Sequence, residues 1–159
     1  MPPSTHEVFN QVDELRGYDL FATDRPLVEA ARAAGAGWVL PALEDYGVVI
    51  GSAASFAEAE LANRHEPELV RYDARGRRVD HVEFHPAWHA LMAKARRTGW
   101  ITLPFRDARP GRWVASAAFL YLHSQVESGT MCPSTMTWAS VPLLQREPAL
   151  WPLVGERLY

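Results

Sequence analysis

The feature that most constrains the fold is an apolar-rich run of ten residues from Trp113 to Leu122. A segment that is apolar almost all round is typical of a central helix that other elements cover on most sides. Ten residues fall well short of the roughly 20 that a helix needs to span a membrane. We therefore expect a buried core helix, running from about Pro110 to Glu127.

Start and stop residues mark the other helices. Thr23 or Asp24 can cap a helix that has Pro26 in its first turn, and Gly35 and Gly37 close that helix. Ser52 or Ser55 starts a later helix, and Glu58 follows Ser55 at capping-box spacing. The expected helices span residues 27–34, 38–50, 52–63, 86–98, 110–127, 134–145 and 149–159.

The clearest amphipathic pattern follows Pro86. Trp88, Leu91, Met92 and Ala95 stand at positions i, i+3, i+4 and i+7, which places them on one apolar helix face. The six tryptophans of the chain fall largely within these expected helices, and such aromatic residues usually form core.

The stretch before Pro86 reads differently. Residues 79–84 alternate apolar and polar with period two, which indicates an extended segment. Residues 67–72 fit either a short helical turn or the partner strand of a small hairpin near 69–84, with a tight turn at Asp73–Gly76. The pattern as a whole predicts an all-α helical bundle with little strand.

Residues 1–24 form an irregular N-terminal arm in which no hydrophobic period holds. We expect Val8 and Phe9 to dock this arm onto the helical body. The arm has neither the basic region nor the apolar region of a signal peptide. Residues 25–159 form the helical domain, and 159 residues suit one domain.

Charge and cysteine content narrow the class of protein. Sixteen basic and nineteen acidic residues give a net charge of −3, which provides no overall basic footprint for nucleic acid. Cys132 is the single cysteine, so an internal disulfide is impossible. We expect a cytoplasmic protein.

Several groups could carry chemistry, and each has a plainer interpretation. His81, His85 and His89 recur every fourth residue, but Pro86 places the first two before a helix, so capping and surface roles are favoured over metal binding. Cys132 needs a base to act as a nucleophile, and His123 is the nearest histidine in sequence. Free cysteine is more often a small buried hydrophobe.

Three further groups are weaker signals. The segment Gly35–Gly37 begins like a dinucleotide loop but lacks the third glycine, so it reads as a helix end. The basic groups Arg75–Arg78 and Lys94–Arg97 could contact phosphates, although two solvated faces are favoured. The polar residues that follow the central apolar run either line a cavity or fix helix packing; they are His123, Ser124, Gln125 and Glu127.

An ordered set of segments carries a family resemblance. The segments are residues 8–11 (VFNQ), 35–38 (GAGW), 61–63 (LAN), 67–80 (PELVRYDARGRRVD), 82–89 (VEFHPAWH), 123–129 (HSQVESG) and 132–137 (CPSTMT). In order and spacing they resemble the AidB branch (DNA alkylation response) of the acyl-CoA dehydrogenase superfamily, over nearly the whole chain. The region between Val12 and Phe21 and the residues after Leu144 match it less closely.

The resemblance implies that this chain is the N-terminal helical domain of a longer flavoprotein, truncated before a middle β-domain and a C-terminal helical domain. FAD binds in the full-length family, mainly between those two later domains. The flavin signature and the catalytic carboxylate lie later in the family's sequence, so no catalytic residue and no metal site are assigned here. A domain separated in this way should expose an apolar patch rimmed by polar residues.

The resemblance also implies one candidate cofactor site and a set of partners. Met136 and Thr137 belong to a segment that is expected to face the flavin and substrate cavity, although packing of a helix N-terminus is an equal alternative. The implied partners are the remaining domains and a homotetramer, with DNA bound only through a region outside this chain and no membrane. The alternatives are a free-standing helical interaction module without catalysis and a small enzyme that uses the histidines or Cys132.

Overall fold

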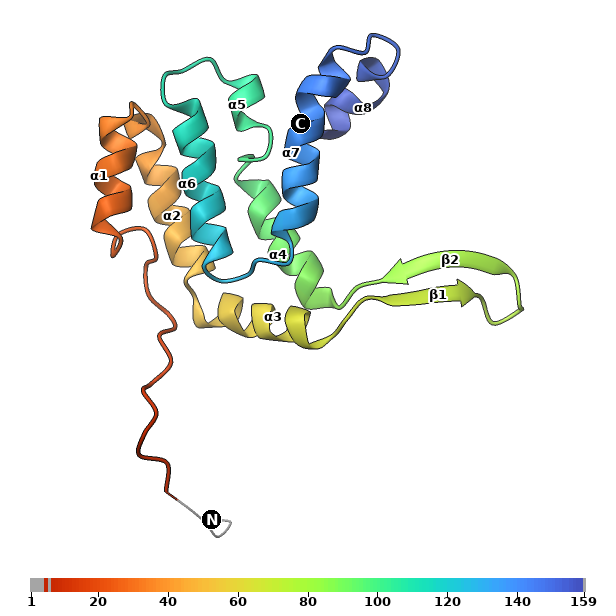
Figure 1. Cartoon of the computed structure of the whole chain (residues 1–159), viewed down its shortest axis with the longest axis horizontal. Coiled ribbons are helices and arrows are strands. Elements are labelled where there is room, and N and C mark those ends of the chain that lie inside the picture. The colour runs from red at the N-terminus through yellow and green to blue at the C-terminus, as the bar shows by residue number, and fades with distance from the viewer. Residues whose placement is uncertain (1–4, 6, 159) are drawn as a thin grey trace.

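The computed structural model describes residue 5 and residues 7–158, with the Glu156 side chain excepted. Helix α6 (Arg112–Ser124) lies against α1 and α2 and buries Ala115, Ala118, Phe119 and Leu122 (Figure 1). The central apolar helix is therefore confirmed. Its last turn ends at Ser124 rather than at Glu127, which frees Glu127 to fold back.

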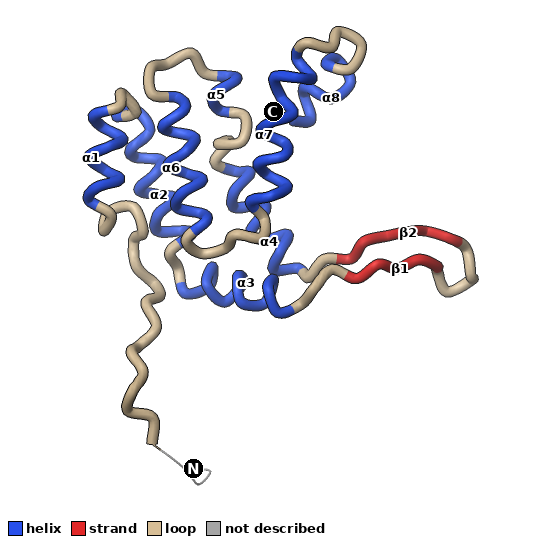
Figure 2. The backbone as a smooth tube through the Cα atoms, viewed as in Figure 1, coloured by secondary structure: helices blue, strands red, loops and turns tan. Residues whose placement is uncertain are grey.

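The remaining elements follow the expected order (Figure 2). They are α1 (Arg25–Ala33), the 3₁₀ helix η1 (Gly37–Val39), α2 (Leu40–Ile50), α3 (Ala53–Arg64), β1 (Glu68–Tyr72), β2 (Arg78–Glu83), α4 (Pro86–Arg97), α5 (Leu103–Arg106), α7 (Met131–Gln145) and α8 (Trp151–Leu158). The all-helical class with one hairpin is confirmed, and Tyr159, the expected end of the last helix, lies outside the described residues.

Capping residues set the limits of α1. The Asp24 side chain accepts a hydrogen bond from Leu27 N at 3.0 Å and so satisfies a free N–H group of the first turn. At the other end Ala36 N donates to the carbonyl of residue 31 and Gly35 N to that of residue 32, with Gly35 at φ +78°. These bonds form a Schellman motif, so the interpretation of Gly35–Gly37 as a helix end is confirmed.

Helix α3 is capped differently from the expected capping box. Ser52 is the N-cap, and its Oγ accepts from Ser55 N at 3.2 Å. Glu58 forms an ion pair with Lys94 of α4. The capping-box role of Glu58 was wrong, because a cation from the neighbouring helix takes up its carboxylate.

The hairpin alternative for residues 69–84 is confirmed, and the helical turn over 67–72 was wrong. Strands β1 and β2 pair antiparallel, with Leu69 opposite Val82, and a register shift falls between Val70 and Tyr72. The Asp73 carboxylate accepts from Arg75 N and Arg77 N and closes the turn. Ten of the eleven strand residues are exposed, and the hairpin projects from the helical body (Figure 1).

The N-terminal arm meets the body later in the sequence than expected. Val8 is 62% exposed and Phe9 is 89% exposed, so docking through these two residues was wrong. Leu20 and Phe21 are the apolar residues of this region that enter the core. The arm reaches the body near Gly51, whose carbonyl accepts from the backbone N–H groups of residues 17 and 18.

One feature of the C-terminal half was not predicted. The short helix α5 turns the chain between α4 and α6. Helix α7 continues through Pro142, which has no N–H and therefore leaves the carbonyl one turn earlier without its helical donor. No helix in the described part of the chain combines the length and the apolar character needed to cross a membrane.

A substitution at Gly111 tests the close contact between the start of α6 and the segment that follows α1. We expect Gly111→Ala to destabilise the fold by more than about 2 kcal/mol, because a left-handed φ strains alanine and its Cβ would meet Ala36 N. A Cβ at position 111 would lie 2.5 Å from Ala36 N, and the backbone there has φ +74°. Urea denaturation measures the change. Gly37→Ala is the control, since its Cβ would meet nothing within 4 Å and φ is ordinary; an equal loss in both variants would contradict the argument.

Candidate functional site

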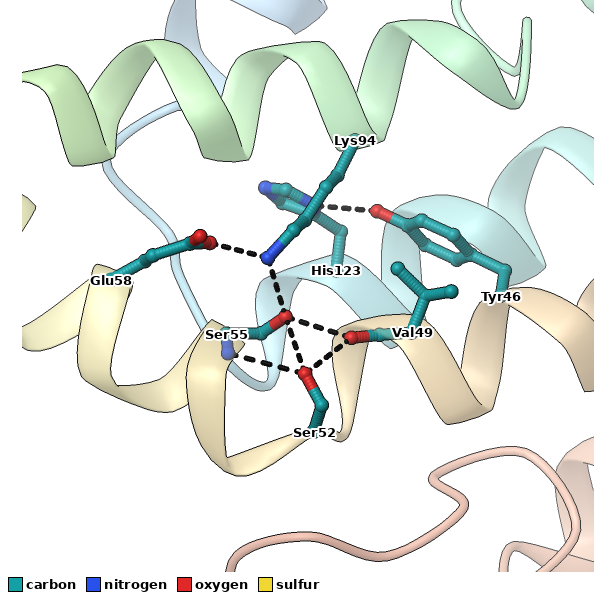
Figure 3. Close-up of polar contacts among 7 residues, drawn as sticks. All are labelled: Tyr46, Val49, Ser52, Ser55, Glu58, Lys94 and His123. Carbon is teal, nitrogen blue, oxygen red and sulfur yellow. Dashed lines mark hydrogen bonds and ion pairs between the residues drawn. The ribbon is translucent and has the colours of Figure 1, made fainter.

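A buried chain of hydrogen bonds joins α2, α6 and the segment that leads into α7. Tyr46 Oη lies 2.7 Å from His123 Nδ1, and His123 Nε2 lies 2.8 Å from Thr130 Oγ1. Thr130 Oγ1 lies 2.5 Å from Glu127 Oε2. His123 and Thr130 are fully buried, and Glu127 and Tyr46 are 3% and 5% exposed. Figure 3 shows the bond between Tyr46 and His123.

Counting the available hydrogens shows in which direction each hydrogen bond of this series is donated. Thr130 has one hydroxyl hydrogen and donates it to the Glu127 carboxylate. His123 Nε2 must then carry the hydrogen that faces Thr130, which leaves Nδ1 of a neutral imidazole as an acceptor. Tyr46 therefore donates its phenolic hydrogen to His123, and every bond in the chain points toward Glu127.

The electrostatics agree with that direction. Burial lowers the pKa of His123, the Glu127 carboxylate opposes this, and the Lys94 ammonium adds to the lowering. Burial also raises the pKa of the Tyr46 phenol above its usual range. Both rings are consequently held in their neutral forms near pH 7.

The Glu127 carboxylate is buried but fully bonded. Gly129 N and Thr130 N donate to it at 2.5 and 2.7 Å, and Asn63 Nδ2 of α3 lies at 3.5 Å. Hydrogen bonds from backbone N–H groups stabilise the ionised form of a buried carboxylate. Glu127 thus holds the loop between α6 and α7 in place and reaches α3.

A second polar group ties α2, α3 and α4 together (Figure 3). Lys94 Nζ donates to Ser55 Oγ at 2.8 Å and pairs with Glu58. Ser55 Oγ donates to the Val49 carbonyl at 2.7 Å. Ser55 is therefore not prepared as a nucleophile, because its hydrogen faces a carbonyl and its neighbour Lys94 is a paired cation.

Two surface pockets flank the buried chain. One of about 340 Å³ is lined by Tyr46 and Lys94, and another of about 510 Å³ is lined by Glu127 and Asn63. Each end of the hydrogen-bonded chain therefore reaches a different pocket wall. The arrangement can hold α2, α6 and the loop before α7 in register.

The structure places Met136 and Thr137 on α7. Met136 is 74% exposed, and Thr137 Oγ1 donates to the Pro133 carbonyl at 3.0 Å. Neither residue lines the two pockets described above.

The histidines at positions 81, 85 and 89 are not brought together. His81 lies on the exposed strand β2, and His85 caps α4 through Ala87 N at 3.2 Å and stacks on His65. His89 contacts Phe84 edge-on. In the described part of the chain, no group of three or more His, Cys, Asp or Glu side chains is placed to hold a metal ion.

Cys132 and the basic residues of the hairpin remain apart from this network, whereas Lys94 of the second basic group pairs with Glu58. Cys132 is a free, exposed thiol, whereas both ring nitrogens of His123 are bonded to other side chains. Arg77 and Arg78 pair with Asp73 and Asp80 within the hairpin.

Sequence reasoning found two members of the network and missed the rest. The polar residues after the apolar run included His123 and Glu127, and both are buried in the bonded chain, whereas Ser124 and Gln125 are exposed. Tyr46 and Thr130 were missed. Tyr46 is bonded to His123, which lies 77 residues later in the sequence, and no local pattern reveals a contact over that separation.

Comparison with solved structures defines the class of fold. The chain superposes on Caenorhabditis elegans ACDH-11, solved in complex with C11-CoA, with a TM-score of 0.78 and 23% identity over 98% of this chain and 28% of that one. It superposes on Bd2924 in its apo form with a TM-score of 0.76 and 26% identity, over 87% of this chain and 28% of that one. The likeness shows that this chain shares the fold of the corresponding part of ACDH-11.

Sequence comparison narrows this to one family. The family described as the adaptive response protein AidB N-terminal domain matches residues 10–159. The putative acyl-CoA dehydrogenase AidB of Escherichia coli strain K12 is 46% identical over 160 residues, covering 96% of this chain. The chain belongs to the AidB N-terminal domain family. It spans about 30% of the length of that E. coli relative.

The buried imidazole makes stability depend on pH. Because its pKa is lowered on folding, His123 contributes stability above its unfolded pKa of about 6.5, and this is lost as pH falls through the folded value. We expect the free energy of unfolding to drop by up to about 1.4 kcal/mol per pH unit in that window. His123→Gln should flatten this slope, and His81→Gln, at an exposed site, should not; equal slopes in all three proteins would refute the assignment.

The donor role of Tyr46 can be tested separately. We expect Tyr46→Phe to lower the free energy of unfolding by about 1–3 kcal/mol, because His123 Nδ1 is left as a buried acceptor without a donor. Chemical denaturation at pH 7.5 measures the loss. Tyr72→Phe, on the hairpin at 59% exposure, is the matched control and should be neutral. A neutral Tyr46→Phe would show that the phenol is not the donor.

Proposed function

We propose that this chain is the N-terminal scaffold of an AidB-like, acyl-CoA dehydrogenase-type flavoprotein, with residues 1–24 as an arm and residues 25–159 as the helical domain. In this proposal the chain alone is inactive. Its helices complete a flavin and substrate cavity only together with a middle β-domain and a C-terminal helical domain. Family membership and the share of the E. coli relative that the chain spans support this assignment.

One observation carries the proposal: α7 lies at the edge of the bundle (Figure 1) and exposes large apolar side chains on one side. Met136 and Leu143 stand seven residues apart on one side of the helix and are 74% and 67% exposed. Leu153 of α8 is 67% exposed as well. Exposed apolar surface of this kind is typical of a docking face.

Met136 and Thr137 are the residues that we propose to face FAD. The Met136 side chain is exposed and apolar, which suits contact with the edge of a flavin ring. The Thr137 hydroxyl donates to Pro133 and keeps acceptor capacity. When bound, FAD would supply the oxidoreductase chemistry, and the remaining domains would supply its phosphate contacts.

The wider biology is part of the same proposal. The full-length protein would be cytoplasmic, would assemble as a homotetramer, and would act in the response to DNA alkylation. Contact with DNA would come from a region outside these residues, because the net charge of −3 offers no basic footprint here.

A chimera tests the scaffold role. We expect this chain, fused in place of the corresponding segment of E. coli AidB, to yield a yellow protein with a flavin absorbance band. The chain alone should purify colourless and should not oxidise acyl-CoA, because it lacks most of the cofactor contacts. Absorbance spectra and flavin release on denaturation measure both.

Matched charge insertions locate the docking face. Met136→Glu in the chimera should lower flavin occupancy at least about tenfold, because a carboxylate would be buried without a partner. Val79→Glu, on the hairpin at 48% exposure, should leave the occupancy unchanged. A colourless chimera that folds, or a yellow chain alone, would overturn the proposal and favour the free-standing interaction module.

A further inference from the structure

We propose that the pocket where the hairpin joins the helical body binds a small organic cation whose ammonium group is fully alkylated. Figure 1 shows the end of α3 and the start of α4 side by side at this point. The pocket has a volume of about 510 Å³, within the range of about 300–1,000 Å³ that is usual for ligand sites. Its acidic, amide, aromatic and glycine lining residues carry the argument; they are Asn63, Glu66, Phe84, Trp88, Glu127 and Gly129.

The pocket is lined by two carboxylates and by no lysine or arginine. Glu66 is exposed, whereas Glu127 is 3% exposed. Among the described residues neither of them belongs to an ion pair, because Arg64 of α3 pairs with Glu60 and Lys94 of α4 pairs with Glu58. A concave site lined by charge of one sign attracts ligands of the opposite sign. The charge of this pocket therefore selects a cation.

The Glu127 carboxylate offers its charge but no free lone pair. Gly129 N donates to Oε1 at 2.5 Å, and Asn63 Nδ2 lies 3.5 Å from the same atom. Because Asn63 and Gly129 both line the pocket, Oε1 lies at its wall. Thr130 N and Thr130 Oγ1 donate to Oε2 at 2.7 and 2.5 Å.

These four donors decide which kind of cation fits. A carboxylate has about four lone-pair sites, and neutral donors occupy those of Glu127 without compensating its charge. A primary ammonium would bring N–H groups that find no acceptor on this carboxylate. An ammonium that is fully alkylated has no N–H groups to satisfy, so it gains the electrostatic attraction without leaving a donor unpaired.

Aromatic rings supply the second requirement of an alkylated cation. Phe84 and Trp88 both line the pocket, are half-buried, and stack with their ring centroids 4.2 Å apart and their planes 24° apart. The faces of tryptophan and phenylalanine rings attract cations, and quaternary ammonium groups are commonly bound in this way. The methyl groups of such a ligand also suit the apolar ring surface.

Other cations and neutral ligands fit the pocket less well. A metal ion needs several free oxygen or nitrogen ligands, and the described part of the chain has no group of three or more His, Cys, Asp or Glu side chains placed for one. A neutral apolar ligand would cover the aromatic rings but would gain nothing from the two carboxylates. Only a cation with an apolar surface uses both features.

The test compares choline with the neutral alcohol in which a carbon atom replaces its nitrogen. Both probes have the same shape, so the difference in affinity isolates the charge. We expect choline to shift the Trp88 indole N–H resonance saturably and to bind about tenfold more tightly than the alcohol, because only choline gains the cation–π and carboxylate attraction. Nuclear magnetic resonance measures both titrations, and loss of one indole signal in Trp88→Leu assigns the resonance.

Matched charge variants locate the site. Glu66→Gln removes a lining carboxylate and should weaken choline binding about threefold without affecting the alcohol. Glu68→Gln, at an exposed position of β1 outside the lining, is the control and should bind choline as the parent does. Because both positions are exposed, these variants keep the test decisive if Trp88→Leu does not fold.

Three results would overturn the proposal. They are equal affinity of the parent chain for both probes, equal loss of choline binding in Glu66→Gln and Glu68→Gln, and unchanged choline binding in a folded Trp88→Leu. Binding is measured on the chain without flavin, so the outcome is separate from that of the scaffold role proposed above.

Discussion

The buried carboxylate of Glu127 is the group on which the arrangement of the helices depends. An ionised carboxylate at 3% exposure is tolerable only if several donors converge on it. Two backbone N–H groups and the Thr130 hydroxyl do so, and these donors come from the loop that carries the chain from α6 into α7. The requirement to satisfy this charge therefore determines the path of that loop, and through His123 and Tyr46 it fixes α2 against α6.

Much of the fold could be predicted, because its signals are local. The apolar run from Trp113 to Leu122 predicted the central helix, and Asp24 and Gly35 predicted both ends of α1. Other local patterns had two solutions. Residues 67–72 fit a helical turn or a strand, and only pairing with β2 decides between them. Glu58 had capping-box spacing, yet Lys94 from another helix took its carboxylate.

The candidate site was harder to predict, because its contacts are long-range. His123 and Glu127 were noticed as polar residues after an apolar stretch, but their partners depend on how α2 packs on α6. Tyr46 looks like an ordinary apolar position of α2 until His123 is placed beside it.

The buried polar chain and the exposed apolar residues of α7 have different physical roles. The polar chain from Tyr46 to Glu127 is satisfied entirely by residues within the described part of the chain, so it stabilises the bundle without help from other domains. The apolar face of α7 is the reverse, since Met136 and Leu143 remain in contact with water. In the proposed docking, burial of these side chains would add a driving force of roughly 25 cal/mol per Å² of apolar area.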